Sequence, residues 1–387
     1  MATITLPGPD RSLRRYATQP PRAFPARAAE PFNRVALAAA HVVADPLASA
    51  DPWIETRLDW DATIAYRRHL WALGFGVAEA MDTAQRGAGL EWSSALELIR
   101  HSLDAAKDVP GALLYCGAGT DHLGAGAHRL DQVISAYEKQ VAAIEELGGR
   151  IVLMASRALA AAARGPGDYA KVYDRILGQV KNKVILHWLG DMFDPALAGY
   201  WGHKDLDAAS DVMLDIVKRH RTKIDGVKIS LLDKQREVAL RWLLPEGVRM
   251  YTGDDFNYAE LIAGDGERHS DALLGIFDAI APAASAALAA LAHDEPKRFH
   301  DILAPTVPLA RHIFRAPTRF YKTGVVFMAY LNGHQRHFTM VAGQESARSL
   351  LHLVEIFQLA DAAGLLADPD LACARMATVL RLHGVEP

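Results

Sequence analysis

The strongest constraint on this fold is a repeated alternation of short apolar runs with longer helical patterns, which begins at Arg34. Continuous apolar runs of this length are typical of parallel strands that are buried on both faces. The predicted strands are Val35–Val43, Phe75–Met81, Gly111–Cys116, Ile151–Ala155, Lys183–Trp188, Asp225–Ser230, Val248–Thr252 and Asp271–Phe277. Eight strands separated by helices over roughly 250 residues predict a closed (β/α)8 TIM barrel. A doubly wound open sheet is the main competing fold.

The chain divides into three parts by pattern. Residues 1–33 are rich in Pro, Arg and Ala and form an N-terminal arm, either extended or disordered. Residues 34–280 make the predicted barrel, in which the clearest helix is Leu130–Leu147. Residues 281–387 show helical patterns only and predict a helical C-terminal extension. Its predicted helices are Ala283–His293, Pro296–Ile302, Pro308–Phe314, Arg319–Leu331, Gly343–Ala363 and Asp370–Leu382.

Composition excludes several classes of function. Half of the 387 residues are apolar, which is enough for a large core, and the net charge of -4 gives no signal for binding nucleic acid. The longest apolar stretch, Ala279–Ala292, is too short to cross a membrane. The N-terminus lacks the apolar core of a signal peptide, so we expect none. Cys116 and Cys373 have neither disulfide nor zinc spacing. We therefore expect a cytoplasmic protein without a membrane or nucleic-acid partner.

Lys228 lies within the apolar run Ile224–Ser230. A buried ammonium without a partner is costly, and a lysine can avoid that cost by remaining neutral. A neutral amine is a nucleophile toward carbonyl carbon. The alternatives are a carboxylate partner or a strand edge from which the side chain reaches water.

Polar residues gather where the predicted strands end. In a barrel, the residues at the C-terminal strand ends and in the following loops form the active site. Each of them also has a plain role as a cap or turn residue. Besides Lys228, the candidates are Asp82, Thr83, Ser156, Arg157, His187, Ser230, Asp254 and Asp255.

Four segments resemble the dihydrodipicolinate synthase and N-acetylneuraminate lyase superfamily of class I Schiff-base aldolases. More narrowly, the chain resembles a branch of it classed as a domain of unknown function. Gly226–Ser230 resembles the strand that carries the family's imine-forming lysine. The other segments are Val184–Trp188, Tyr251–Asp255, and Trp71–Gly74 through Leu90–Trp92. The resemblance implies an imine on Lys228, a small-molecule carbonyl substrate, no further cofactor, and a homo-oligomer, either a dimer or a tetramer.

The sequence departs from that family at three places. His187 replaces the family's proton-relaying tyrosine, and Asp82-Thr83 replaces its carboxylate-binding Thr-Thr pair. The arginine that often follows the tyrosine strand is missing from 190–195. An aspartate at position 82 would repel a carboxylate, so a polyhydroxylated, sugar-derived carbonyl compound fits better than pyruvate.

The resemblance and the residue types together assign roles to the candidates. Lys228 would form the imine and His187 would carry protons. Thr83 and Ser230 would hold substrate or relay protons, or else cap backbone. Ser156 would face the substrate. Arg157 would bind an anion or pair with a loop carboxylate. Asp254 and Asp255 would bind hydroxyls, although Asp254 could equally cap the next helix.

Two other functions remain open at this point. The first is a metal-dependent sugar isomerase or epimerase, for which His187, Asp191, Asp194 and His203 would supply ligands. No pair has the i, i+4 helical spacing of a strong metal motif, so a metal is not favoured. The second is a non-catalytic sugar-binding barrel. The segment Gly117–Thr120 lacks a full dinucleotide fingerprint, so no nicotinamide cofactor is expected.

Overall fold

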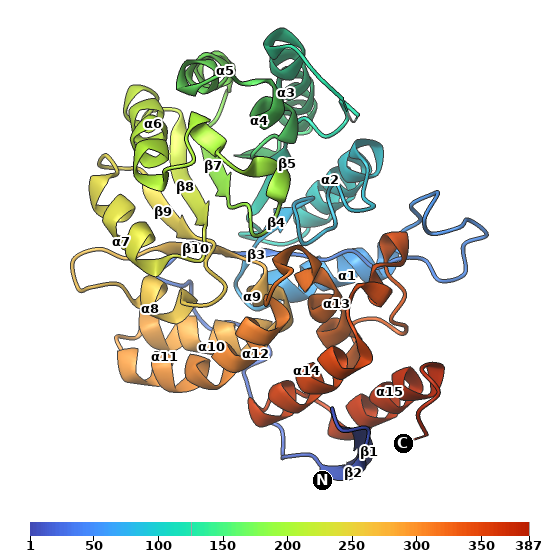
Figure 1. Cartoon of the computed structure of the whole chain (residues 1–387). Coiled ribbons are helices and arrows are strands. Elements are labelled where there is room, and N and C mark those ends of the chain that lie inside the picture. The colour runs from blue at the N-terminus through green and yellow to red at the C-terminus, as the bar shows by residue number, and fades with distance from the viewer. Residues whose placement is uncertain (125, 387) are drawn as a thin grey trace. The chain divides into compact units, whose positions relative to one another are not determined.

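The apolar runs form the strands of a closed parallel barrel (Figure 1). In the computed structural model, which describes residues 1–124 and 126–386, eight strands pair side by side in the order β10-β3-β4-β5-β6-β7-β8-β9. The strands are β3 (Ala36–Ala39), β4 (Gly76–Glu79), β5 (Leu114–Ala118), β6 (Arg150–Leu153), β7 (Val184–Leu189), β8 (Ile224–Ser230), β9 (Arg249–Thr252) and β10 (Asp271–Leu274). Each lies within or overlaps one predicted run. The barrel prediction is confirmed, and the open-sheet alternative is wrong because β10 closes onto β3.

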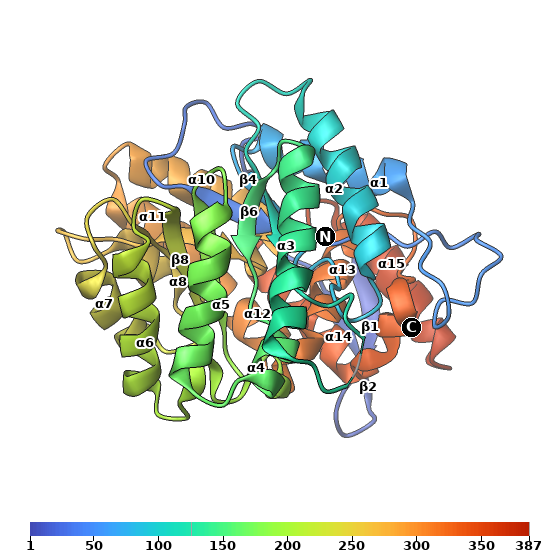
Figure 2. The same ribbon diagram turned by 90° about the horizontal axis from the view of Figure 1, so that it is seen from above.

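Alternate residues of these strands fill the barrel interior, because successive side chains of a strand point to opposite faces. Leu37, Ala78, Val152, Ile185 and Leu273 belong to one buried cluster inside the barrel. Helices lie outside the strands, as Figure 2 shows for several of them. In this part of the chain they are α2 (Trp92–Ala106), α3 (Leu130–Glu146), α4 (Arg157–Ala162), α5 (Pro166–Gln179), α6 (Leu206–Arg219), α7 (Lys234–Leu243) and α8 (Tyr258–Ala263).

The chain divides into two compact units. One consists of residues 34–40 and 75–274 and contains the barrel strands. The other consists of residues 1–33, 41–74 and 275–387. Its elements are β1 (Thr3–Pro7), β2 (Leu13–Ala17), α1 (Trp60–Ala72), α9 (Ile276–Ala279), α10 (Ala281–Ala292), α11 (Pro296–Leu303), α12 (Val307–Ile313), α13 (Tyr321–Leu331), α14 (Leu350–Ala362) and α15 (Pro369–Leu382). The domain boundaries at residues 33 and 280 remain a prediction, since compactness does not measure independent folding.

The N-terminal arm contains a regular element that its composition did not indicate. β1 and β2 pair as an antiparallel hairpin, and the Tyr16 hydroxyl donates a hydrogen bond of 2.7 Å to Asp361 on α14. Throughout residues 1–124 and 126–386, every helix is too short or too polar to span a membrane.

Several element boundaries differ from the prediction, such as the end of the strand predicted at Val35–Val43, which stops at Ala39. The helix predicted at Gly343–Ala363 begins only at Leu350, because Arg348 and Ser349 have extended backbone. Ser349 then caps α14 by accepting a hydrogen bond from the His352 amide. Similarly, the strand predicted at Asp271–Phe277 ends at Leu274, where the chain turns into α9.

Gly226 is required by a close approach inside the barrel. A Cβ at this position of β8 would lie 2.6 Å from the Tyr251 ring and 2.7 Å from the Arg249 carbonyl oxygen. We expect Gly226→Ala to lower the free energy of unfolding by about 1–3 kcal/mol, through overpacking. Gly178→Ala in α5 is the control, because its Cβ would meet nothing within 4 Å. That variant should be neutral or stabilising by up to about 1 kcal/mol. Urea unfolding measures both, and equal effects would contradict the packing argument.

Candidate active site

Lys228 lies in the barrel interior, on the fifth residue of β8. In the strand register it is flanked by His187 on β7 and Tyr251 on β9. Residues that pair in this way point to the same face of a sheet, and Tyr251 belongs to the interior cluster. Only 7% of Lys228 is exposed. The prediction of a lysine in a buried strand is therefore confirmed, and β8 has neighbours on both sides, so the strand-edge alternative is wrong.

Burial lowers the pKa of Lys228 from 10.5 to about 8. The cause is desolvation, because an ammonium loses its hydration inside the barrel. The negative charges of Asp255 and Asp82 oppose this shift without cancelling it. A lysine with this pKa is half neutral near pH 8, so it offers a large population of nucleophilic amine at physiological pH.

His187 is buried next to Lys228 and is also held neutral. Burial and, second, the positive charge of Lys228 lower the pKa of His187 well below its usual value of 6.5. Its Nε2 lies 3.2 Å from the Ser230 hydroxyl, and either atom can be the donor, depending on the imidazole tautomer. Ser230 lies two residues beyond Lys228 on the same face of β8. The three side chains predicted for strands β7 and β8 therefore lie together.

The turn after β9 packs directly on the lysine. A Cβ at Gly253 would lie 2.8 Å from Lys228 Cε and 2.2 Å from Ser230 Oγ, so a side chain there would displace both groups. Asp255, in the same turn, acts on Lys228 through its charge. Asp254 has a structural role, since its Oδ1 accepts hydrogen bonds from the amides of Phe256 and Asn257. The capping alternative for Asp254 is therefore present in the structure.

A buried glutamate outside the barrel holds this turn, and the sequence analysis missed it. Glu237 on α7 accepts hydrogen bonds from the Thr252 hydroxyl at 2.9 Å and from the Ser270 hydroxyl at 2.7 Å. The same Thr252 oxygen accepts the Asp254 amide at 3.1 Å. Burial raises the pKa of Glu237 to about 8. One signal in the sequence could have revealed Glu237. It stands three residues before Leu240, so both lie on the buried face of α7, where a carboxylate is unusual.

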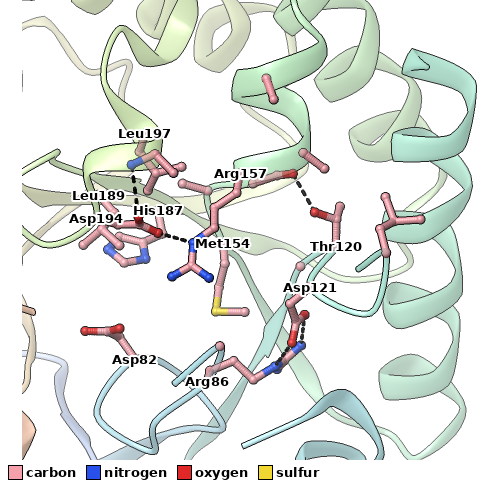
Figure 3. Close-up of a pocket in the computed structure, with 18 of the residues that line it drawn as sticks. Asp82, Arg86, Thr120, Asp121, Met154, Arg157, His187, Leu189, Asp194 and Leu197 are labelled. Atoms are coloured by element: carbon pink, nitrogen blue, oxygen red, sulfur yellow. Dashed lines mark hydrogen bonds and ion pairs between the residues drawn. The ribbon is translucent and has the colours of Figure 1, made fainter. Parts of the chain in front are cut away.

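A cavity of about 560 Å³ reaches this group of residues at His187. Four of the candidates from the sequence line it, namely Asp82, Ser156, Arg157 and His187. Figure 3 labels Asp82, Arg157 and His187 among the side chains around the cavity. Of the remaining candidates, Thr83, Lys228, Ser230, Asp254 and Asp255 are buried and lie outside the described lining. Two lining residues relate the cavity to Lys228. His187 pairs with Lys228 in the strand register, and the charge of Asp82 acts on the lysine.

Ser156 and Arg157 stand at the start of α4. The Ser156 hydroxyl accepts the Leu159 amide at 2.9 Å, which makes it the N-cap, and it lies 2.6 Å from the Thr120 hydroxyl. Arg157 Nε donates to Asp194 Oδ2 at 2.5 Å. The guanidinium of Arg157 reaches into the cavity beside Met154 (Figure 3). The pairing of Arg157 with a loop carboxylate, one of the two predicted alternatives, is thus present.

Arg86 is a second cation of the cavity wall that the sequence analysis did not select. Its Nε and Nη2 bind both carboxylate oxygens of Asp121 at 2.7 Å. Its Nη1 donates to the carbonyls of Ala80 and Gly117 at 3.0 Å, and Nη2 also donates to Gln140. All five N–H groups of a guanidinium are therefore used. Arg86 holds the loops of the cavity together and has no donor left for a substrate.

The residues considered for a metal do not assemble into a ligand set. Asp194 binds Arg157 and caps the short helix that follows it, and His187 faces Ser230. Among residues 1–124 and 126–386, no group of three or more His, Cys, Asp and Glu side chains is arranged to hold a metal ion.

Comparison with protein families gives one match, which spans nearly the whole chain. The model described as "Protein of unknown function (DUF993)" matches residues 4–385. No curated protein matches the sequence.

Solved structures with the same fold include dihydrodipicolinate synthases. The enzyme from Aquifex aeolicus has a TM-score of 0.63 at 12% identity, and the match covers 86% of this chain and 99% of that one. A chloride-inhibited enzyme from Acinetobacter baumannii, complexed with pyruvate, has a TM-score of 0.63 at 14% identity, covering 86% and 99%. The enzyme from Oceanobacillus iheyensis has a TM-score of 0.59 at 13% identity, covering 84% and 96%. The resemblance expected from the sequence is confirmed for the fold.

The charge of Asp255 should tune the pKa of Lys228. Because a negative neighbour favours the ammonium, we expect Asp255→Asn to lower the pKa of Lys228 below about 8. The pH dependence of reductive methylation at Lys228, followed by mass spectrometry, measures this pKa. Asp254→Asn is the matched control, because its carboxylate binds within the turn and is not among the charges that shift Lys228. An unchanged or raised pKa in Asp255→Asn would sink this assignment.

Glu237 should make stability depend on pH. Its folded pKa of about 8 lies above the ordinary 4.5, so the folded state keeps a proton that the unfolded chain has lost. The free energy of unfolding should therefore fall as pH rises from 4.5 to 8. Glu237→Gln lacks this titrating group. The difference in the free energy of unfolding between Glu237→Gln and wild type should therefore shift in favour of the variant by up to about 5 kcal/mol between pH 4.5 and pH 8. Urea unfolding at both values tests it, with exposed Glu246→Gln as control. Parallel pH profiles of Glu237→Gln and wild type would contradict the prediction.

Proposed function

We propose that this chain, which belongs to the DUF993 family, is a Schiff-base-forming lyase or aldolase that acts on a sugar-derived carbonyl compound. The observation that carries the proposal is Lys228, which is buried in the barrel interior, in register with His187, with a pKa lowered to about 8. Buried lysines with lowered pKa values are the usual nucleophiles of imine chemistry. The shared fold with dihydrodipicolinate synthases supports it.

The chemistry begins with the neutral amine of Lys228. Its lone pair forms a C–N bond to the carbonyl carbon, and the π electron pair moves onto oxygen. Proton transfer gives a carbinolamine, whose hydroxyl is protonated and leaves as water, so that an iminium remains. In cleavage, the β-hydroxyl loses its proton and becomes a carbonyl as the Cα–Cβ bond breaks. The electron pair of that bond forms an enamine C=C bond, the iminium π pair moves onto nitrogen, and a proton then adds to Cα to restore the iminium. Alternatively, loss of the α-proton expels a β-hydroxyl as water. Hydrolysis of the imine releases the product and restores Lys228.

His187 is the proton carrier in this scheme. Its lowered pKa keeps the imidazole neutral, so it accepts the proton that the attacking amine loses and returns it to the departing hydroxyl. The Ser230 hydroxyl, 3.2 Å from His187 Nε2, holds the ring. His187 lines the cavity, which gives it access to a substrate that enters from there.

The charges of the cavity favour a hydroxylated substrate over a 2-oxo acid. Asp82 and Glu91 bring negative charge to the lining. Arg86 has no N–H group left. Arg157 pairs with Asp194 through Nε, which compensates part of its charge and leaves its Nη groups for a substrate hydroxyl. Carboxylates accept hydrogen bonds from sugar hydroxyls but repel a carboxylate. A polyhydroxylated aldehyde or ketone is therefore the proposed substrate class.

A homo-oligomer, either a dimer or a tetramer, is part of the proposal. It rests on the resemblance described above and is measured directly by light scattering of the eluting protein.

Borohydride trapping tests the proposed imine. Wild type is treated with sodium borohydride and, separately, dihydroxyacetone, D-glyceraldehyde or pyruvate. We expect a stable mass increase at Lys228 that is several times greater with dihydroxyacetone or glyceraldehyde than with pyruvate. Arginine cannot form this imine, so Lys228→Arg should lose the adduct, while Lys223→Arg keeps it. Trapping that is unchanged by EDTA separates this chemistry from metal-dependent isomerisation. An adduct on other lysines only would reject the proposal.

A further inference from the structure

A second cavity lies wholly within the unit formed by residues 1–33, 41–74 and 275–387. Its volume of about 450 Å³ falls within the range of roughly 300–1,000 Å³ that is usual for ligand pockets. Most of its wall is apolar and comes from the N-terminal arm, α1, α10, α13 and the turn after α14. Phe24, Leu73, Met328 and Leu365 contribute to this wall. Such a cavity favours a ligand with an apolar body.

Three rings form the polar side of this cavity. Tyr66 and His69 come from α1, and His334 follows α13. The ring centroids are 4.9 Å apart for Tyr66 and His334, 5.6 Å for Tyr66 and His69, and 4.6 Å for His69 and His334. Rings with tilted and edge-on neighbours at these distances suit a further aromatic ring.

Most of the polar groups around these rings already have partners. The Tyr66 hydroxyl donates to the Asp278 carbonyl at 2.6 Å. The Asp278 carboxylate accepts the backbone amide of His41 at 2.7 Å and lies 2.8 Å from its Nδ1. The Asn332 amide donates to the Met328 carbonyl and accepts from the Ala367 amide. These groups therefore hold the cavity wall together.

Two imidazole nitrogens are exceptions. Nε2 of His41 and Nε2 of His69 are both buried without a hydrogen-bond partner in the part of the chain that the structure describes, and of these two residues His69 lines the cavity. A buried nitrogen without a partner costs free energy, so a group that fills the cavity and bonds to it is favoured. Burial lowers the pKa of His69 and lowers that of His334 to about 3, so both rings are uncharged near neutral pH. Neutral imidazole offers one donor and one acceptor, and a hydroxyl can satisfy either.

We propose that this cavity binds a small uncharged aromatic molecule that carries a hydroxyl group. The hydroxyl bonds to His69 Nε2, and the ring packs among His334, Tyr66 and Met328. Charged ligands fit less well at the three rings, because the Asp278 carboxylate is committed to His41 and the imidazoles of His69 and His334 are neutral. The cation of the wall, Arg22, instead stacks over the Phe24 ring, with its Cζ 5.5 Å from the ring centroid. The site is independent of Lys228 and of the proposed lyase activity.

Phenol, toluene and benzoate separate the contributions to binding. All three have one ring, but only phenol adds an uncharged hydroxyl, and benzoate adds a negative charge. Titration by calorimetry or ligand-observed NMR should show phenol binding at least fivefold more tightly than toluene, with benzoate weakest. In protein with ¹⁵N-labelled histidine, phenol should shift the Nε2 resonance of His69.

Variants locate the site. His69→Leu should remove the preference for phenol over toluene and leave toluene binding in place. His69→Gln, which keeps a hydrogen-bonding group, should retain part of the preference and guards against a folding defect in the leucine variant. His300→Leu is the matched control, because His300 is exposed on α11 of the same unit and does not line the cavity. Equal or tighter binding of benzoate, a preference that survives His69→Leu, or no saturable binding of any probe would each overturn the proposal.

Discussion

Removal of the Lys228 amine from water is the constraint on which the candidate site depends. The barrel places this side chain between His187 and Tyr251, where desolvation outweighs the opposing charges of Asp255 and Asp82. The amine is therefore partly neutral near physiological pH. The lysine's residual charge also helps keep His187 neutral. Burial at this place thus keeps both the Lys228 nucleophile and the His187 proton acceptor available on adjacent strands.

The barrel buries two cations with opposite results. Arg86 is surrounded by acceptors for all of its N–H groups, so its charge is stable and its role is structural. Lys228 instead lies between His187 and Tyr251 and close to Gly253, and the charges of Asp255 and Asp82 compensate its own charge only in part. A buried cation whose N–H groups all have acceptors stays charged and holds loops in place. A buried amine whose charge is only partly compensated has a lowered pKa and can react as a nucleophile. The difference between the two residues lies in their neighbours and not in their depth.

Reactive geometry at Lys228 also depends on groups outside the barrel. Glu237 on α7 binds the Thr252 hydroxyl, which binds the Asp254 amide, and this turn carries Gly253 and Asp255 to the lysine. Burial raises the pKa of the Glu237 carboxyl, so it stays protonated at pH values where an ordinary glutamate is ionised. In the other unit, burial likewise keeps His69 and His334 neutral around a second cavity. Desolvation therefore sets the protonation states that matter in both units.

The sequence by itself determined the barrel, the positions of its strands and the placement of Lys228 in a buried strand. These features follow from local patterns, because a continuous apolar run reports burial on both faces wherever it occurs. The helix predicted from Gly343 starts only at Leu350, because the extended backbone of Arg348 and Ser349 interrupts a pattern that is otherwise helical. Only the tertiary structure decided which side chains meet. The pairs Arg157 with Asp194, Arg86 with Asp121, and Glu237 with Thr252 join different elements of the fold. Such contacts depend on strand register and turn geometry, which no local pattern of residues encodes.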